Sequence, residues 1–321
     1  MRAVVFTRRG GPDVLRVEER PDPVPGDGEV LIEVAAAGIS YSEVLARVGL
    51  YPKAPEPPAV LGYDVAGTVA GTAERVAAFV RHGGYAERAV AHADDVLSLP
   101  DELTFEEGAA IPLAFATAYG ALARYGGGQP GERVLVHGAA GGVGTAATAL
   151  ARELGLEVWG TASTGKQDLL RELGVHHPLD YTAQGWDERL PPFDIVMDAL
   201  GGRSFAHSYR LLGAGGRLVC YGASNVLSGD RRNVLRAAAT IARTPRFNPM
   251  RLLKESRTVI GLDTIELWDR KGSLGELIRP LAPLVAEGRV KPKVAATFPL
   301  AEAPAAHRHL SERRQPGKVV L

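Results

Sequence analysis

The residues whose types and spacing point most clearly to chemistry lie in the segment 131–166. Within it, a strand-like run, Val134 to Val136, is followed after His137 by glycines and alanines and then by an Ala- and Leu-rich helical pattern. The small residues are therefore predicted to form a strand-to-helix turn. Gly141 would let the backbone approach a pyrophosphate, and Gly144 would let the helix pack closely on the strand, while the helix N-terminus offers N–H groups to the anion. This combination predicts a dinucleotide-binding site.

The glycine pattern departs in one respect from the usual GxGxxG, because Ala139 occupies the place of the first glycine and Gly138 precedes it. An ordinary strand-to-helix turn is the alternative interpretation. A second strand-like segment, 156–161, follows at the distance expected of a βαβ unit and favours the cofactor interpretation. The predicted pyrophosphate contacts are Ala140, Gly141, Gly142, Val143 and Gly144.

The end of the second strand indicates which nicotinamide cofactor would bind. An NAD site places an Asp or Glu about 20 residues beyond the glycines, where the carboxylate holds the ribose 2′-hydroxyl. The segment 161–166 reads TASTGK and contains no acidic residue. Ser163 and Lys166 suit an additional 2′-phosphate, so the sequence predicts NADPH. The alternative for Lys166 is a solvated loop position.

The composition excludes several classes of function. Acidic and basic residues balance at 37 each, which gives no overall field that would recruit nucleic acid or an anionic membrane. The single Cys220 excludes a disulfide framework, and no apolar run reaches the roughly 18 residues of a membrane span. The segment Met1 to Val5 has a strand pattern and no signal-peptide pattern. We therefore expect a soluble cytoplasmic protein.

The elements that must position these residues follow two different patterns. Residues 1–99 read as short strands separated by Gly and Pro, which predicts a compact domain resembling a β-barrel. A helical pattern covers 103–123. From 131 to 262, six strand-like segments alternate with helical ones, which predicts a doubly wound parallel sheet and an α/β fold.

The C-terminal part carries a helical pattern over 274–287 and two strand-like segments, 294–300 and 317–321. These two segments must pair outside the finished parallel sheet. We therefore predict a first domain of residues 1–117 and 263–321, with a nucleotide-binding domain of residues 118–262 inserted between its halves. The last strand of the inserted domain, 258–262, would leave an unpaired sheet edge that a second copy could cover, which predicts a homodimer.

A cluster of arginines lies in the segment 231–257. A basic stripe of this kind can bind nucleic acid, but the segment contains no aromatic interleaving beyond Phe247 and no neighbouring RNA-binding motif. A solvated helical face is the preferred interpretation, with no nucleic-acid partner. The arginines are Arg231, Arg232, Arg236, Arg243, Arg246, Arg251 and Arg257.

The chain as a whole resembles the zinc-independent quinone oxidoreductase branch of the medium-chain dehydrogenase/reductase superfamily, which includes zeta-crystallin. The resemblance rests on the segments GGPDVL, AAGISYSEVLARVGLYP, GYDVAG, GGYAE, IPLAFATAY, PGERVLVHGAAGGVG and LSERRQPGKVVL. Within the branch, NVLSGDRRN and NPMRLLKESRTVIG are most similar to the vesicle amine transport protein group. The resemblance implies a GroES-like catalytic domain, a Rossmann domain, NADPH, a homodimer, and two-electron reduction of quinones or α,β-unsaturated carbonyl compounds.

The resemblance also bears on metal binding. The zinc-dependent relatives hold zinc with a Cys and a His-Glu pair, and the corresponding positions here are Ser40, Tyr63 and Asp64. Hydroxyls and one carboxylate cannot form a tight zinc site, so we predict no metal ion. Without a metal, a conjugated acceptor is easier to reduce than an isolated ketone.

Four residues are candidates for catalysis. Ser40 and Glu43 stand where the family usually has Asn and Asp, and Ser40 would lie near the nicotinamide. Tyr41, Tyr51 and Tyr63 are the available phenols, any of which could donate a hydrogen bond or a proton. For Tyr63, packing under the cofactor is an equal alternative.

Further cofactor contacts follow from the resemblance alone. Thr117 would contact the nicotinamide ribose or ring, or else cap a helix. Tyr181 and Arg313 match family positions near the adenosine phosphate, and Gly222 and Ala223 would lie at the nicotinamide half. Lys318 is either a residue that closes the site or a surface residue, and we expect His176, His177, His307 and His309 to be exposed.

Two alternatives to a quinone or enone reductase remain open. A 2-enoyl-thioester reductase would need a larger pocket and cations for a carrier phosphate. An NADPH-binding protein with little turnover would share the same fold, because fold alone does not determine activity.

Overall fold

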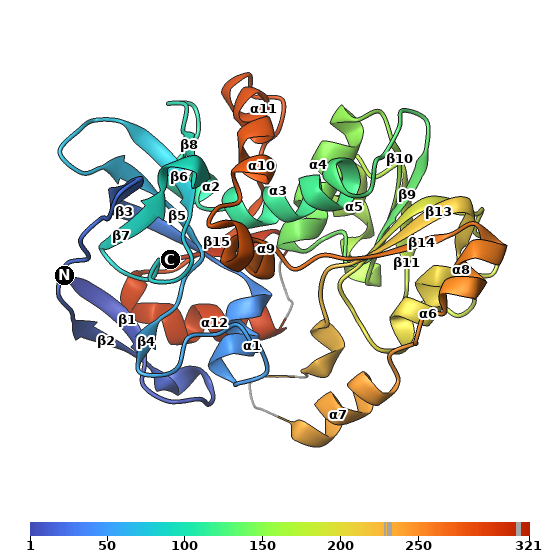
Figure 1. The fold of residues 1–321 in the computed structure, drawn as a ribbon, viewed down its shortest axis with the longest axis horizontal. Coiled ribbons are helices and arrows are strands. Elements are labelled where there is room, and N and C mark those ends of the chain that lie inside the picture. Colours follow the sequence, from blue (N-terminus) through green and yellow to red (C-terminus); the bar gives the residue numbers. More distant parts are fainter. Residues whose placement is uncertain (228, 230–232, 313–315) are drawn as a thin grey trace. The chain divides into compact units, whose positions relative to one another are not determined.

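The computed structural model describes residues 1–227, 229, 233–312 and 316–321, and its elements fall into two compact units (Figure 1). The first unit comprises Met1–Ala116 and Thr264–Leu321 together with Leu227, and the second comprises Thr117–Val226 and Asn233–Asp263. Both ends of the chain therefore belong to the first unit. The two main changes of unit fall between Ala116 and Thr117 and between Asp263 and Thr264.

The first unit is built on two sheets. The larger has seven strands in the order β15-β16-β3-β5-β6-β8, with β7 pairing with β3 off this path, and the smaller has the order β2-β1-β4. The strands are β1 (Arg2–Phe6), β2 (Leu15–Glu19), β3 (Glu29–Ile39), β4 (Ala59–Val60), β5 (Asp64–Val69), β6 (Arg75–Phe79), β7 (Arg88–His92), β8 (Val96–Ser98), β15 (Val294–Thr297) and β16 (Lys318–Val320). The C-terminal strands β15 and β16 thus complete a sheet that begins near the N-terminus.

Strand β3 organises the larger sheet because it pairs with three partners. Its first half pairs with β7, its second half with β5, and its end with β16, where Val319 lies opposite Ile39. The pairing with β5 shifts register between Val34 and Ala36. Gly67 lies opposite this irregularity, and a Cβ there would come within 1.9 Å of the Glu33 carbonyl oxygen. Only glycine permits this close approach of the two backbones.

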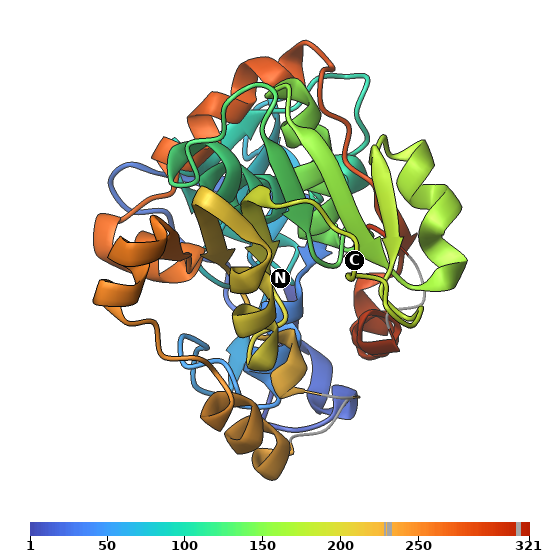
Figure 2. The ribbon, with the colours of Figure 1, turned by 90° about the vertical axis from the view of Figure 1, so that its right-hand side faces the viewer.

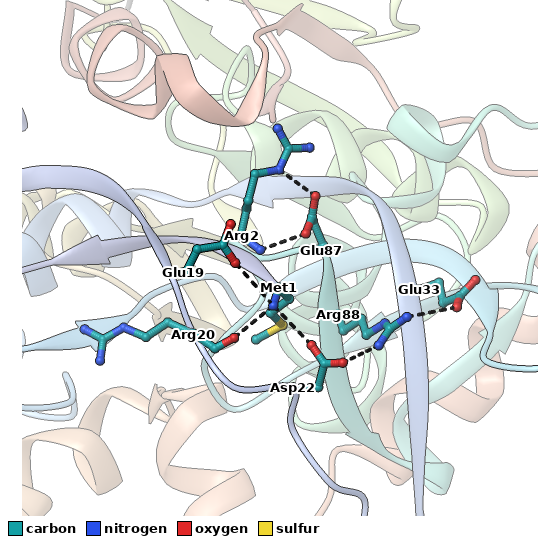
Figure 3. Close-up of polar contacts among 8 residues, drawn as sticks. All are labelled: Met1, Arg2, Glu19, Arg20, Asp22, Glu33, Glu87 and Arg88. Atoms are coloured by element: carbon teal, nitrogen blue, oxygen red, sulfur yellow. Dashed lines mark hydrogen bonds and ion pairs between the residues drawn. The ribbon is translucent and has the colours of Figure 1, made fainter.

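Charged side chains hold the N-terminus to the first unit (Figure 3). The terminal ammonium of Met1 lies 3.3 Å from an Asp22 carboxylate oxygen and donates to the Arg20 carbonyl oxygen at 2.9 Å. Arg88 pairs with the same Asp22, and the ammonium lowers the pKa of that carboxyl group. Each exposed pair contributes little alone, but the shared Asp22 connects β1 with β7.

The helices of the first unit are short, and prolines explain two departures from the predicted pattern. They are α1 (Tyr41–Arg47), α2 (Phe105–Gly108), α3 (Pro112–Tyr119), which runs into the second unit, α9 (Thr264–Lys271), α10 (Gly275–Ile278), α11 (Ala282–Ala286) and α12 (Ala303–Glu312). The helix predicted over 103–123 is broken before Pro112, and the one predicted over 274–287 is interrupted by a 3₁₀ turn that contains Pro280. Proline lacks the N–H that a continuous helix requires.

The second unit is a doubly wound parallel sheet, as predicted. Its six strands, visible in Figures 1 and 2, have the order β11-β10-β9-β12-β13-β14, in which the direction of winding reverses between β9 and β12. The strands are β9 (Arg133–Val136), β10 (Glu157–Ala162), β11 (His177–Asp180), β12 (Phe193–Asp198), β13 (Leu212–Cys220) and β14 (Thr258–Gly261), and the helices are α4 (Gly142–Glu153), α5 (Gln167–Glu172), α6 (Arg203–Arg210), α7 (Val234–Ala242) and α8 (Pro249–Glu255).

The central strands of this sheet are wholly buried, as parallel sheets covered on both faces require. The side chains of Val134 to Val136 in β9 and of Ile195 to Met197 in β12 have no exposed surface. Strand β14 lies at the end of the order and has half-exposed residues. Throughout the described part of the chain, no helix has both the length and the apolar character needed to cross a membrane.

Candidate functional site

The glycine-rich segment forms the predicted turn between β9 and α4. Gly138 has a positive φ of 67°, and Gly141 is the N-cap residue of α4. A Cβ on Gly144 would lie 2.3 Å from the Gly138 carbonyl oxygen, so the glycine permits close packing of the helix on the turn, where the sequence predicts close packing on the strand. Gly138 and Gly141 are exposed, and the first turn of α4 presents its N–H groups at the same end. This arrangement is suited to an anion.

The residues predicted near the adenosine phosphate lie together at the ends of β10 and β11. Ser163 follows β10 and begins the 3₁₀ turn that contains Lys166, and Tyr181 follows β11, with its N–H donating to the Ala162 carbonyl oxygen at 3.2 Å. The Tyr181 side chain is 54% exposed. The nearby carboxylate of Asp180 accepts hydrogen bonds from the Thr164 and Thr182 hydroxyls, which lower its pKa. Arg313, predicted for the same region, lies outside the described residues.

The residues predicted for the nicotinamide half follow β13. Gly222 and Ala223 pack on the loop after β12, because a Cβ on Gly222 would lie 3.0 Å from the Ala199 carbonyl oxygen. Two backbone hydrogen bonds hold the two loops together: the Ser224 N–H donates to the Ala199 carbonyl oxygen at 2.8 Å, and the Asn225 N–H donates to the Leu200 carbonyl oxygen at 2.9 Å. Thr117 lies on α3 and is buried.

In the first unit, three adjacent strands bring Ser40, Asp64 and Lys318 together. Lys318 lies in β16, Ser40 follows β3, and Asp64 begins β5. The Lys318 ammonium donates to Ser40 Oγ and to Asp64 Oδ2, each at 2.5 Å, and Asp64 Oδ1 accepts the Leu113 N–H at 2.6 Å. Lys318 is 4% exposed and Asp64 is 0% exposed, so the surface alternative for Lys318 is wrong.

A glycine makes room for this buried ion pair. A Cβ on Gly38 would lie 2.7 Å from Lys318 Cε and 2.2 Å from the Ala109 carbonyl oxygen. The absence of a side chain at Gly38 therefore lets the lysine stem run across β3 to reach Ser40.

Glu43 joins the backbones of two candidate residues. Its carboxyl group accepts the Ser40 N–H and, at 3.1 Å, the Tyr63 N–H. Burial raises the pKa of Glu43 to about 8, against the opposing effects of the Lys318 ammonium and the Ser40 N–H. The Tyr63 side chain is 0% exposed, and its ring stacks on Phe79 with centroids 6.3 Å apart.

The other two candidate phenols are less deeply placed. Tyr41 begins α1 directly after Ser40 and is half-buried. Tyr51 is also half-buried and packs against the apolar core of the first unit.

A buried polar cluster around His307 was missed at the sequence level. The prediction that His307 is exposed is wrong: its ring is wholly buried, with Nε2 3.3 Å from the Tyr85 hydroxyl and Nδ1 3.4 Å from Arg47 Nε. Burial and the Arg47 guanidinium lower the pKa of His307 to about 3. The helical spacing of Ala303, Ala306 and His307 on one face of α12 is a signal that could have revealed this. Three more histidines are predicted from the sequence to be exposed. His176 is exposed, whereas His177 and His309 are half-buried.

The arginine-rich segment forms two separate helices rather than one face. Arg236, Arg243, Arg246 and Arg251 are exposed, in keeping with a solvated surface. Arg257 is half-buried and donates to the Tyr209 carbonyl oxygen at 3.0 Å, and Arg231 and Arg232 lie outside the described residues.

Comparison with known proteins identifies the family. A model described as "Alcohol dehydrogenase GroES-like domain" matches residues 26–101, and one described as "Zinc-binding dehydrogenase" matches residues 173–321. The rat protein named "Synaptic vesicle membrane protein VAT-1 homolog" is 34% identical over 338 residues, which cover 100% of this chain and 84% of the relative. The chain belongs to the medium-chain dehydrogenase/reductase superfamily. The resemblance inferred from the sequence is thereby confirmed.

Solved structures of this superfamily agree with the fold. The quinone oxidoreductase of Thermus thermophilus, also solved as a complex with NADPH, is 37% identical with a TM-score of 0.81, covering 100% of this chain and 99% of that one. The CurK enoyl reductase is 26% identical with a TM-score of 0.85, covering 99% and 98%. The first unit is the GroES-like part of the medium-chain fold, and the second is its Rossmann part.

Proposed function

We propose that this medium-chain oxidoreductase uses NADPH to reduce quinones or α,β-unsaturated carbonyl compounds by hydride transfer, without a zinc ion. The observation that carries the proposal is the buried contact of Lys318 with Ser40 and Asp64. The quinone oxidoreductase relative that binds NADPH supports the same cofactor and acceptor class. The cytoplasmic location stays a prediction from the sequence.

The side chains present do not fit a zinc site. Ser40, Tyr63 and Asp64 stand where the zinc-dependent relatives have their ligands, and zinc requires thiolate, imidazole or carboxylate donors. The Asp64 carboxylate already binds the Lys318 ammonium and the Leu113 N–H, and an ammonium at this distance would repel a divalent cation. Within the ranges that the structure describes, no group of three or more His, Cys, Asp or Glu side chains is arranged to hold a metal ion.

The second unit supplies the proposed cofactor site. We assign the pyrophosphate to the turn from Ala140 to Gly144 and to the N-terminus of α4, because Gly141 is exposed and Gly142 is only half-buried, and the N-terminus of a helix favours an anion. Ser163 and Lys166 would hold the 2′-phosphate, with Tyr181 beside them, since the 161–166 segment contains no acid. The nicotinamide half is assigned to Thr117, Gly222 and Ala223. Arg313 is also proposed to bind the adenosine phosphate, from the resemblance alone.

The first unit supplies the proposed groups for the acceptor. A bound nicotinamide supplies the hydride. Hydrogen-bond donors are needed where negative charge develops on the acceptor oxygen, and a proton must follow. We propose Ser40, whose hydroxyl oxygen accepts from the Lys318 ammonium, together with the phenols of Tyr41 and Tyr51. Tyr63 keeps both roles, donor or packing residue, although its burial favours packing.

The test is NADPH consumption by the purified protein against a panel of quinones, enones and enoyl-thioesters, with and without a strong chelator, alongside elemental analysis. We expect turnover with a quinone or an enone, unchanged by the chelator. Equimolar zinc in the active protein, or loss of activity on chelation, would overturn the zinc-free proposal.

Two other outcomes of the panel would favour the two alternative functions. Turnover restricted to enoyl-thioesters would favour a 2-enoyl-thioester reductase, which the similarity to the CurK enoyl reductase supports. Tight NADPH binding with no turnover across the panel would favour a binding protein of low activity.

We also propose a homodimer. Strand β14 ends the parallel sheet of the second unit, and a second copy could continue the sheet across this edge. The residues Thr258 to Gly261 keep part of their surface exposed, as an uncovered edge requires.

A further inference from the structure

Four buried polar side chains of the second unit have no part in the chemistry proposed above. His137 follows β9 directly, Thr161 lies in β10, Asp198 ends β12 and Ser208 lies on α6. None is more than 4% exposed. Because β9 lies between β10 and β12, His137 stands at the point where the winding of the sheet reverses. Dinucleotides bind at such a point in open α/β sheets.

The four side chains are joined end to end by hydrogen bonds. His137 Nδ1 lies 3.3 Å from Thr161 Oγ1, and His137 Nε2 lies 3.1 Å from Ser208 Oγ. The Ser208 hydroxyl donates to Asp198 Oδ2 at 2.7 Å. The imidazole therefore bridges a hydroxyl on the neighbouring strand and a hydroxyl that is bound to a carboxylate.

The direction of each hydrogen bond follows from the number of protons. Ser208 has one hydroxyl proton and gives it to Asp198, so its oxygen must accept from His137 Nε2. Burial lowers the pKa of His137, so the ring is neutral and its Nδ1 carries no proton. Nδ1 must then accept from the Thr161 hydroxyl, whose oxygen remains available as an acceptor. In all three hydrogen bonds that join the four side chains, the donated proton points from the Thr161 end towards Asp198.

The Thr161 end of the chain holds the glycine turn. Thr161 Oγ1 accepts the Gly138 N–H at 3.2 Å, and the Thr161 carbonyl oxygen accepts the Ala139 N–H at 3.0 Å. Two successive backbone groups of the turn before α4 are thus fixed by one residue of β10.

The Asp198 end holds the loop that follows β12. Asp198 Oδ1 accepts the Leu200 N–H at 2.7 Å and the Gly201 N–H at 3.4 Å. Ser204, which lies on α6 and not in this loop, donates its hydroxyl to Oδ2 at 2.7 Å. Gly201 has a positive φ of 78° in this loop, and a Cβ there would lie 3.0 Å from Ala223 Cα. The four hydrogen-bonded side chains therefore connect the glycine turn with the loop on which Gly222 and Ala223 pack.

We propose that Thr161, His137, Ser208 and Asp198 are positioning residues that hold the glycine turn and the loop after β12 in the single arrangement that accepts the dinucleotide. This role rests on the NADPH binding proposed above. The residues act through the backbone of the two segments and need not touch the cofactor. Because all the donated protons point one way, the proposal predicts one tautomer of His137, which a core that only fills space would not require.

The first test measures the tautomer of His137 by ¹⁵N NMR of the apo protein at pH 7, with its signal assigned through His137→Gln. We expect the proton on Nε2. In Asp198→Asn, the amide oxygen keeps the Leu200 N–H, so the amide nitrogen donates to Ser208. The Ser208 proton must then turn towards His137 Nε2, and we expect the ring proton to move to Nδ1. Ser204→Ala is the matched control, because Ser204 binds the same carboxylate outside the chain, and it should keep the proton on Nε2.

The second test measures the NADPH dissociation constant by fluorescence titration. Asp198→Ala, which removes the acceptor of the Leu200 N–H, and Thr161→Val should each weaken binding by about tenfold or more, whereas Ser204→Ala should stay within about twofold. Circular dichroism verifies that each variant is folded. Thr161→Val is nearly isosteric and leaves the Asp198 end intact, so it tests the role even where Asp198→Ala fails to fold.

In the wild type, a His137 proton on Nδ1 or a charged ring would overturn the proposal. Unchanged NADPH binding in folded Thr161→Val or folded Asp198→Ala would also overturn it. Failure of the proposed function has a different signature. In that case the wild type itself would not bind NADPH, and the positioning role would fall with it whatever tautomer the apo protein showed.

Discussion

Replacing Lys318 with methionine should cost more stability than any exposed charge substitution in the first unit. The ammonium is the cation that balances Asp64, and both side chains are almost wholly buried. In Lys318→Met, the Asp64 carboxylate would keep the Leu113 N–H but lose its charged partner. Removing one partner of a buried ion pair typically costs about 3–5 kcal/mol, because the other charge is left uncompensated.

A double-mutant cycle separates this electrostatic effect from lost packing. Asp64→Asn should also be destabilising, since it leaves the Lys318 ammonium buried and unpaired. The double variant buries no charge, so its cost should be smaller than the sum of the two single costs by about 3 kcal/mol. Arg308→Met is the matched control, because Arg308 pairs with Asp13 at 2.9 Å with both side chains largely exposed. It should cost less than about 1 kcal/mol.

Urea unfolding followed by tryptophan fluorescence is a suitable assay. Trp268 lies in the first unit, where its indole N–H donates to Asp95 at 2.7 Å, whereas Trp159 and Trp186 lie in the second. Replacing Trp159 and Trp186 with phenylalanine in the background would leave a reporter for the first unit alone. If Lys318→Met cost no more than Arg308→Met, or if the two single costs simply added, the buried-ion-pair interpretation would be refuted.

Four further outcomes are expected. NADPH should bind at least about tenfold more tightly than NADH, roughly 1.4 kcal/mol, and Lys166→Ala should remove most of that difference while sparing NADH, as measured by titration. Tyr63→Phe should lower turnover by about 10²-fold or more if the phenol donates a proton, whereas a packing role predicts near-normal turnover, and Tyr51→Phe serves as the comparison. The pKa of His307 is lowered to about 3 in the folded protein, so below about pH 6.5 the unfolded chain binds a proton that the folded protein does not, and the free energy of unfolding falls with the pH. His307→Gln lacks this proton, and in urea unfolding it should lose less stability than the wild type between about pH 6.5 and about pH 4. Light scattering at micromolar concentration should give the mass of a dimer, and a monomer mass would count against pairing through β14.

The sequence was sufficient for the architecture because the pattern of each element is local. Strand-like runs such as Val134 to Val136, each followed by a helical pattern, recur at a spacing that only a parallel sheet satisfies. The ends of the elements were less predictable. A helical pattern over 274–287 reads as continuous, but the ring of Pro280 removes an N–H in the middle of it, and the chain responds with a 3₁₀ turn.

The site was predictable only where it depends on neighbouring residues. Gly138, Gly141 and Gly144 lie in one turn, and their spacing alone indicates close packing of backbone on backbone. Lys318 and Ser40 are 278 residues apart, and their contact depends on the register of β16 on β3. No local sequence pattern encodes that register, so the sequence alone cannot distinguish a lysine whose ammonium is buried from a lysine on the surface. The same reason applies to Tyr85 and His307, which are 222 residues apart and meet through two different elements.

The Lys318 contact also limits which acceptor the proposed chemistry can use. A zinc ion would carry two positive charges and could accept a lone pair of the substrate oxygen directly. The Lys318 ammonium carries a single charge, which Asp64 already compensates. In the proposed chemistry, its remaining influence would act on the acceptor through the Ser40 hydroxyl, as a hydrogen bond rather than a coordinate bond. A hydrogen bond of this kind stabilises an oxygen only in proportion to the charge that develops on it. Quinones and enones spread the arriving electrons over a conjugated system, so they need less stabilisation at oxygen than an isolated ketone does. Under the proposed function, the ion pair would therefore favour conjugated acceptors on electrostatic grounds.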